Sequence, residues 1–117
     1  MEVQIFGTKK SADTRKAQRF FTERRVKVHF VDLNERAASL GELRRFAQKL
    51  GVGSLIDKQS ARYTDLGLQH ARMSDESWLA KLADEPLLLV QPMARFGQKV
   101  TLGLAEVEWK AWVESAE

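Results

Sequence analysis

The first third of the chain alternates between short apolar runs and a helical repeat. Residues 3–6, with the sequence VQIF, predict a short buried strand. Positions at helical spacing follow, and two phenylalanines supply the apolar face of the predicted helix: Ala17, Phe20, Phe21 and Arg24. Residues 26–33 are rich in β-branched side chains and partly alternate, so they predict a second strand. A crossover this short favours a parallel strand pair with a right-handed connection.

The middle of the chain has the pattern of a helical segment. Ser39 and Glu42 match a capping box, and apolar positions then recur at helical spacing until Gly51 ends the helix. A later helix is predicted between a cap at Ser74 and a stop at Pro86. Short helical turns are predicted between the two helices, at residues 54–57 and 62–68.

The last third returns to strands before a final helix. Residues 87–90, with the sequence LLLV, form an uninterrupted apolar run that predicts a third, central strand. Residues 93–102 predict a hairpin that turns near Phe96 and Gly97. A helix is predicted over residues 105–115.

The resulting order is β-α-β, a helical insertion at about residues 36–85, and then β-β-α. This order is similar to that of the thioredoxin-like (glutaredoxin-like) fold of the α/β class. The length of 117 residues predicts a single domain over residues 1–117 that contains the insertion as a subdomain.

Composition narrows the class of protein. The apolar share of 44% and the charged share of 30% are typical of a soluble globular chain. No apolar run approaches the ~20 residues of a membrane span, and the N-terminus lacks a signal-peptide pattern, so we expect a cytoplasmic protein that does not bind membranes. The absence of cysteine excludes disulfides, thiolate catalysis and thiolate metal ligands. Scattered aspartates and two separate histidines give no metal-site spacing, so we expect no metal.

The net charge of +3 is modest, but basic residues concentrate around the first predicted helix. The cluster can be a solvated helix face, or it can meet an anionic ligand or partner. No nucleic-acid-binding motif is present, so direct binding to nucleic acid is not expected. The cluster contains Lys9, Lys10, Arg15, Lys16, Arg19, Arg24, Arg25 and Lys27.

Residues 6–21, with the sequence FGTKKSADTRKAQRFF, form a strand–loop–helix segment that resembles the ArsC family. This family includes arsenate reductases, Spx transcription regulators and a subgroup of small uncharacterised relatives, which the chain resembles most. Three further blocks support the resemblance by their order and spacing: Leu55, Ile56 and Asp57 with Tyr63 and Leu66; QPMARFG from Gln91; and LGLAEVEWKAW from Leu102.

The resemblance assigns roles to several positions. Ser11 falls on the nucleophilic cysteine of the family, and is therefore the candidate catalytic position. Thr14 falls on the second position of the Cys-x-x-Cys motif of Spx-like members, or on the serine or threonine of single-cysteine members. Pro92 falls on the proline that faces the active loop through a cis peptide bond. The family's three oxyanion-binding arginines are replaced, since their positions fall on Asp57, on Gln91 and near Gly103.

The predicted site has a physical rationale in the helix start. Unpaired N–H groups and the positive end of the helix dipole favour an anion there. Candidate residues for binding an anion or a thiol ligand are Lys9, Lys10, Thr14, Arg15, Gln91, Pro92 and Arg95. Arg95 is a basic residue of the region that corresponds to none of the family arginines.

The hydroxyl of Ser11 limits the chemistry. Serine lacks the redox ladder of cysteine, and a serine nucleophile needs a nearby general base, which the positions of His29 and His70 do not suggest. Either Ser11 or Asp13 can cap the helix, and Ser11 can cap it with or without a bound sulfate, phosphate or glutathione carboxylate. The sequence leaves open whether this serine is natural or replaces a cysteine.

Two functions follow from the resemblance. The first is an ArsC-type protein of the glutathione- or glutaredoxin-linked (arsenate) reductase lineage, with no bound cofactor; glutathione or glutaredoxin would be the reductant if position 11 were cysteine. The alternative is an Spx-like binding protein without catalysis, which docks on RNA polymerase or another protein.

Overall fold

The computed structural model describes residues 1–116, which form two compact units. One unit contains Met1–Glu35 together with the residues from Gln91 onward, and the other contains Arg36–Val90. The helical unit thus continues to Val90, beyond the boundary at about residue 85 that the sequence pattern suggests. Within residues 1–116, no helix combines the length and the apolar character needed to cross a bilayer.

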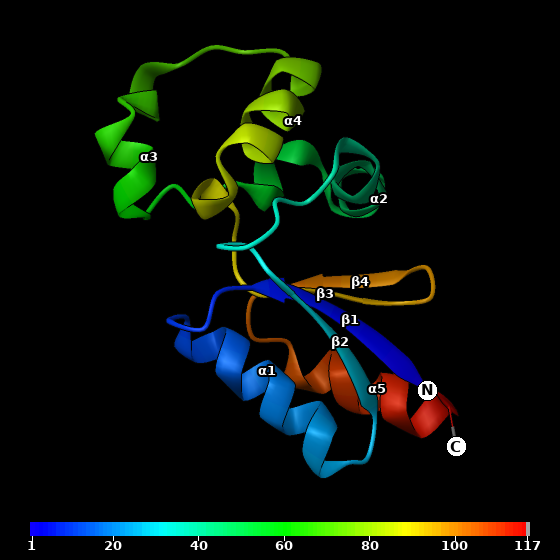
Figure 1. Ribbon diagram of the computed structural model, residues 1–117. Coiled ribbons are helices and arrows are strands. Elements are labelled where there is room, and N and C mark those ends of the chain that lie inside the picture. The colour runs from blue at the N-terminus through cyan, green and yellow to red at the C-terminus, as the bar shows by residue number, and fades with distance from the viewer. Residues whose placement is uncertain (117) are drawn as a thin grey trace. The chain divides into compact units, whose positions relative to one another are not determined.

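The first unit is built on a four-stranded sheet in the order β2-β1-β3-β4 (Figure 1). β1 pairs with β2 in parallel, whereas β1–β3 and β3–β4 are antiparallel. The strands are β1 (Glu2–Gly7), β2 (Lys27–Asp32), β3 (Met93–Phe96) and β4 (Lys99–Leu102), and the helices of this unit are α1 (Ala12–Glu23) and α5 (Glu106–Ala116). The order β1-α1-β2 followed by β3-β4-α5 agrees with the thioredoxin-like order expected from the sequence.

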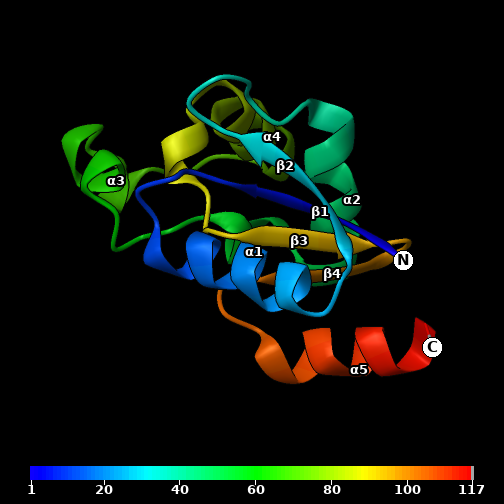
Figure 2. The same ribbon diagram turned by 60° about the horizontal axis from the view of Figure 1, so that its bottom comes forward.

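Helices α1 and α5 lie side by side over one face of this sheet (Figure 2). Aromatic side chains of the two helices pack against this face of the sheet, and the ring centroids of Phe21 and Trp109 are 5.5 Å apart. The indole N–H of Trp109 donates to Thr101 Oγ1 at 2.8 Å, so the buried polar atom is satisfied. The buried residues of this core are Val3, Ile5, Ala17, Phe21, Val26, Ala94, Trp109 and Trp112.

The second unit is helical, as the sequence predicts. It contains α2 (Leu40–Leu50), α3 (Ala61–Asp65) and α4 (Asp75–Asp84), with 3₁₀ turns η1 (Val52–Leu55), η2 (Leu68–His70) and η3 (Pro86–Leu88). The capping box is confirmed, because Ser39 Oγ accepts from Glu42 N at 3.1 Å and Ser39 N donates to Glu42 Oε1 at 2.9 Å. Gly51 ends α2 with a φ of 84°, which glycine adopts without a Cβ penalty.

The predicted third strand at residues 87–90 is wrong. The run begins in η3, and Leu89 makes only an isolated bridge to Ile56. Asp57 N donates to Leu88 O at 2.7 Å and Val90 N donates to Leu55 O at 2.9 Å, so the backbone pairs with the 55–57 segment. The place beside β1 is taken by β3, the first arm of the predicted hairpin, which is confirmed. A short apolar run indicates burial but does not distinguish a strand from other buried backbone.

Candidate functional site

The candidate site begins where β1 runs into α1. Ser11, rather than Asp13, is the N-cap of α1, with an extended backbone and a side-chain oxygen that accepts from Thr14 N at 3.2 Å. Ser11 N donates to Thr8 O at 3.1 Å and so closes the loop before the helix. The predicted capping role of Ser11 is therefore confirmed.

The segment before β3 is joined to this loop. Thr8 donates twice to Gln91 Oε1, from its backbone N at 2.8 Å and from its hydroxyl at 3.0 Å. The following bond, Gln91–Pro92, is cis, as predicted, and Pro92 is buried. Gly103 N donates to Pro92 O at 2.8 Å. The structure thus brings together the loop of Ser11 and the cis proline, although they are about 80 residues apart in the sequence.

Thr14 belongs to the first turn of α1. Its side chain is fully buried, and its hydroxyl has no hydrogen-bond partner among the described residues. A Cβ at Gly7 would overlap the side chain of Thr14, so the last residue of β1 must be glycine for the helix to approach this closely. Sequence reasoning missed Gly7, and the available signal was a glycine directly after a buried apolar run.

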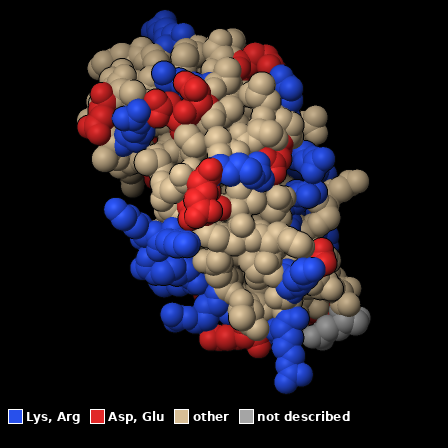
Figure 3. Space-filling model, in the orientation of Figure 1, with Lys and Arg blue, Asp and Glu red and all other residues tan. Residues whose placement is uncertain are grey.

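Positive charge surrounds the helix start. Lys9, Lys10 and Arg15 are exposed, and Arg15 Nη1 donates to Lys9 O at 2.7 Å. None of the three has an ion pair within the described part of the chain, residues 1–116. Lys and Arg side chains gather over α1 in Figure 3. The charge and the helix dipole therefore act in the same direction on an anion near Ser11.

Arg95 is not part of this group. Its Nε donates to Gln4 Oε1 at 3.3 Å and its Nη1 donates to Gly97 O at 3.1 Å. It lines a hollow on the sheet together with Glu2, at the start of β1, and His29. In the strand register, Arg95 pairs with Gln4, three residues before the end of β1 at Gly7.

His29 does not supply a base to Ser11, because it is paired with Glu2 on the sheet. His29 Nε2 lies 3.0 Å from Glu2 Oε2, and this contact, together with Lys27, lowers the pKa of the Glu2 carboxyl. His29 pairs with Gln4 in the sheet and so lies near the middle of β1. His70 belongs to η2 in the helical unit. No group of three or more histidine or acidic side chains within residues 1–116 is arranged to hold a metal ion.

The chemistry of the site follows from these contacts. The helix start, its cationic neighbours and the loop tied to Gln91 can hold a small anion or the carboxylate of a thiol ligand. Ser11 Oγ can accept or donate hydrogen bonds there, but it cannot form a disulfide.

Comparison with known proteins identifies a family and several relatives that the sequence of this chain resembles. The profile of the ArsC family matches residues 6–112. An arsenate reductase from Neisseria meningitidis serogroup A is 27% identical over 105 residues, which cover 87% of this chain and 90% of the relative. The uncharacterized protein YusI from Bacillus subtilis is 25% identical over 114 residues, which cover 94% of this chain and 97% of that protein.

The fold is also shared with a solved structure. An arsenate reductase from Vibrio cholerae superposes with a TM-score of 0.81 at 22% identity, over 92% of this chain and 94% of that one. At this identity the likeness concerns the fold, and it confirms the thioredoxin-like class. The match of the family profile covers most of the sequence and includes both Ser11 and Pro92. The chain therefore belongs to the ArsC family.

Proposed function

We propose that this arsenate reductase-like chain binds a small anion or a glutathione-type thiol ligand at the start of α1, and that it does not reduce the ligand. In this proposal the site descends from the glutathione- or glutaredoxin-linked reductases of the family. The observation that carries the proposal is Ser11 at the N-cap of α1, in a loop that two hydrogen bonds from Thr8 tie to the residue before a cis proline.

The geometry supports binding for three reasons. The N-terminus of α1 presents backbone N–H groups and the positive end of a dipole. Lys9, Lys10 and Arg15 add positive charge that no described carboxylate neutralises. Glutathione carries carboxylates that such a site attracts, and an oxyanion such as arsenate fits the same field.

The residues do not support reduction. A reductase cycle of this type needs a thiolate that attacks and then leaves through a mixed disulfide. Ser11 cannot perform either step, and His29 is occupied with Glu2 on the sheet. The family's oxyanion arginines are also replaced, by Asp57 and Gln91 at two positions. Gln91 instead accepts hydrogen bonds from Thr8 and supports the loop.

The electrostatic field at position 11 can be measured through the pKa of a thiol placed there. A Ser11→Cys substitution should create a thiol whose pKa is below the ordinary value of about 8.5, because the helix start and its cations stabilise the thiolate. Ser74→Cys is a matched control: Ser74 is likewise an N-cap, with its oxygen accepting from Ser77 N at 3.2 Å, but Asp75 and Glu76 follow it. Thiolate absorbance measured against pH should give a pKa at least one unit lower for Cys at 11 than at 74. Equal values would contradict a site shaped for an anion.

An assay of arsenate reduction distinguishes the proposed binding role from a reductase role. The unaltered chain should show no arsenate reduction with glutathione and glutaredoxin. Ser11→Cys should instead exchange with oxidised glutathione, forming a mixed disulfide that mass spectrometry detects and releasing one glutathione thiol. Binding of glutathione to the unaltered chain is measured by calorimetry. Turnover by the unaltered chain would contradict the proposal, as would an inert Ser11→Cys variant together with no binding of glutathione or arsenate.

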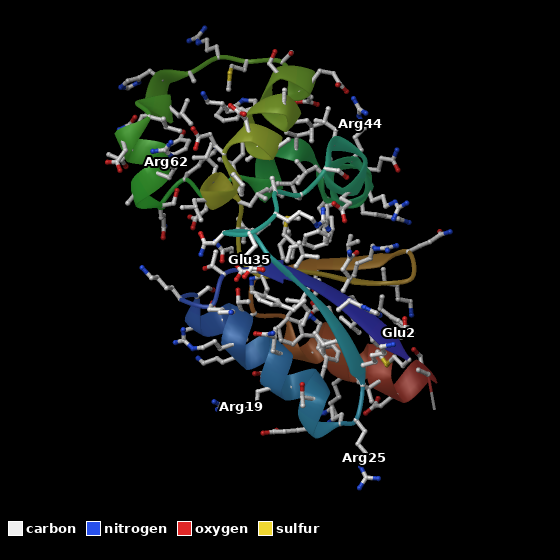
Figure 4. All side chains as sticks on the ribbon, in the orientation of Figure 1. Glu2, Arg19, Arg25, Glu35, Arg44 and Arg62 are labelled. Atoms are coloured by element: carbon white, nitrogen blue, oxygen red, sulfur yellow. The ribbon has the colours of Figure 1, made fainter. Side chains whose placement is uncertain are left out.

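A second candidate is an Spx-like role in which the protein docks on RNA polymerase or another protein. It is favoured by the exposed basic surface of α1, which we define as Lys9, Lys10, Arg15, Lys16 and Arg19. Arg19 extends away from the sheet in Figure 4. Affinity capture from the source cell should recover a stable partner with the unaltered chain and lose it when Arg15, Lys16 and Arg19 are changed to Glu. In the control variant, Arg45 and Lys49 of α2, which are also exposed, are changed to Glu, and the partner should still be recovered. Recovery of no polymerase subunit and no other stable partner would reject this role.

A further inference from the structure

A hollow lies on the sheet, and none of its lining residues belongs to the start of α1. Its volume is about 300 Å³, and it is lined by Glu2, Gln4, His29, Arg95 and Gly97. All five residues belong to the sheet unit. Gln4 pairs with His29 on one side and with Arg95 on the other, so three adjacent strands hold the polar side chains in register. Figure 4 labels Glu2, which is the first residue of β1.

Arg95 is the central charge of the hollow. Its guanidinium is held by two neutral acceptors, Gln4 Oε1 at 3.3 Å and Gly97 O at 3.1 Å. It has no ion pair among residues 1–116, and no described residue accepts from its Nη2. The residue is only partly exposed. A guanidinium that is oriented in this way and has unused donors is prepared to bind a planar anion through two parallel hydrogen bonds.

The carboxylate of Glu2 does not neutralise Arg95, because it is engaged elsewhere. Glu2 Oε2 lies 3.0 Å from His29 Nε2, and Glu2 Oε1 lies 3.6 Å from Lys27 Nζ. Glu2 therefore contacts Lys27 through one carboxylate oxygen and the His29 imidazole through the other. The hollow keeps a positive charge at Arg95, and it is also lined by His29, whose second ring nitrogen donates a hydrogen bond when the imidazole is protonated.

We propose that this hollow binds a small carboxylate, with Arg95 as the main contact and His29 as the second. The planar fork of the guanidinium matches a carboxylate. The nearby Glu2 carboxylate repels a dianion more strongly than a monoanion, so a monocarboxylate is favoured over a dianion such as sulfate. A volume of about 300 Å³ corresponds to the small end of ligand pockets. The site neither uses Ser11 nor depends on the function proposed for it.

The test is a titration of the ¹⁵N-labelled full chain with acetate, followed by NMR at constant ionic strength and pH 6.5. Saturable shifts are expected for the amides of Gln4, His29, Arg95 and Gly97. Arg95→Gln should weaken binding at least tenfold. Arg45→Gln is the matched control, since it removes an exposed arginine of α2, and it should leave the affinity unchanged. Sulfate, which is a dianion at pH 6.5, forms a second arm, and it should bind at least threefold more weakly than acetate.

Several outcomes would overturn the proposal. Shifts confined to the Lys9–Arg15 loop would assign the anion to the helix start, and unsaturable shifts would mean that no site exists at the hollow. Sulfate binding as tight as acetate would reject the preference for a monocarboxylate. If Arg95→Gln fails to fold, His29→Gln decides, because it removes the second contact at the rim and should weaken binding at least threefold. An unchanged affinity in His29→Gln, or in a folded Arg95→Gln, would reject the assignment.

Discussion

At the residue scale, the contact between Gly7 and Thr14 determines how closely α1 approaches the end of β1. Thr14 is buried, and its hydroxyl and methyl groups occupy the space that a Cβ at residue 7 would need. The close contact places the N-cap directly after a loop of three residues. Position 11 can therefore present its side chain at the helix start, whatever its chemical identity.

A substitution cycle tests this contact. Gly7→Ala should lower the free energy of unfolding by about 1–3 kcal/mol, because overpacking forces Thr14 or the helix to move. Gly53→Ala is the control, since nothing lies within 4 Å of the corresponding Cβ and its φ is not positive. The double change Gly7→Ala with Thr14→Ala should recover part of the loss, which denaturant unfolding measures. Additive losses would show that the two residues are not in steric conflict.

At the element scale, caps set where the helices begin. Serine side chains cap four helices by accepting from the backbone N three residues on, at Ser11, Ser39, Ser60 and Ser74. Only Ser39 has the reciprocal contact that completes a capping box. A cap of this kind contributes ~1 kcal/mol, so local sequence is sufficient to mark these starts. The surroundings decide which of these caps belongs to a functional site.

The capping box also predicts a pH dependence. Arg36 Nη1 donates to Glu42 Oε1 at 2.9 Å. This hydrogen bond and the one from the backbone N of Ser39 lower the pKa of Glu42 to about 2. Since the folded pKa is depressed, the stabilisation is present above the unfolded value of about 4.3 and is lost as the pH falls toward 2. Arg36 is half exposed, so we expect ~1 kcal/mol rather than the full value of the shift.

The measurement compares Glu42→Gln with the unaltered chain in urea at pH 7 and at pH 2.5. The difference in the free energy of unfolding should be clear at pH 7 and should largely disappear at pH 2.5. Glu76→Gln is the control, because Glu76 pairs with Arg44 at 2.9 Å on an exposed surface and makes no cap. A difference that persists unchanged at pH 2.5 would contradict this explanation.

At the scale of the whole molecule, charge is distributed unevenly. Residues 9–27 contain eight lysines and arginines and two acidic residues, a net charge of +6 against +3 for the whole chain. Among the described residues, only Lys27 of these eight forms an ion pair, with Glu2. Arg24 instead stacks over the ring of Phe20 at 3.7 Å. Like charges concentrated on one helix repel one another unless a partner or salt compensates them.

Salt should therefore stabilise the folded chain. Raising the ionic strength from 20 to 200 mM NaCl should increase the free energy of unfolding by a few tenths of a kcal/mol, because screening weakens the repulsion along α1. Arg19→Gln should reduce this salt dependence, since Arg19 lies one turn from Arg15 and Lys16. Arg45→Gln in α2 should not reduce it. An equal salt dependence in both variants would mean that the cluster on α1 contributes no measurable repulsion.

Local signals in the sequence determined most of the elements. The Ser11 and Ser39 caps, the end of α2 at Gly51 and the hairpin near Gly97 are confirmed, because each depends on a hydrogen bond or a backbone angle within a few residues. The resemblance also led to the cis bond before Pro92, which is confirmed. The lack of a thiol is likewise a property of the sequence by itself.

Tertiary structure decided the remaining features, because they depend on residues distant in the chain. The run at residues 87–90 is apolar, but only its pairing with Leu55–Asp57 excludes it from the sheet. The hydrogen bonds from Thr8 to Gln91 leave no pattern in sequence spacing, and the glycine after the first apolar run did not by itself indicate that Thr14 would pack against it. Arg95 lies three residues after Pro92 in sequence, yet the register of the strands places it beside Gln4 instead of Ser11. Sequence patterns specify short-range geometry, whereas the register of strands and the packing of helices determine which side chains share a site.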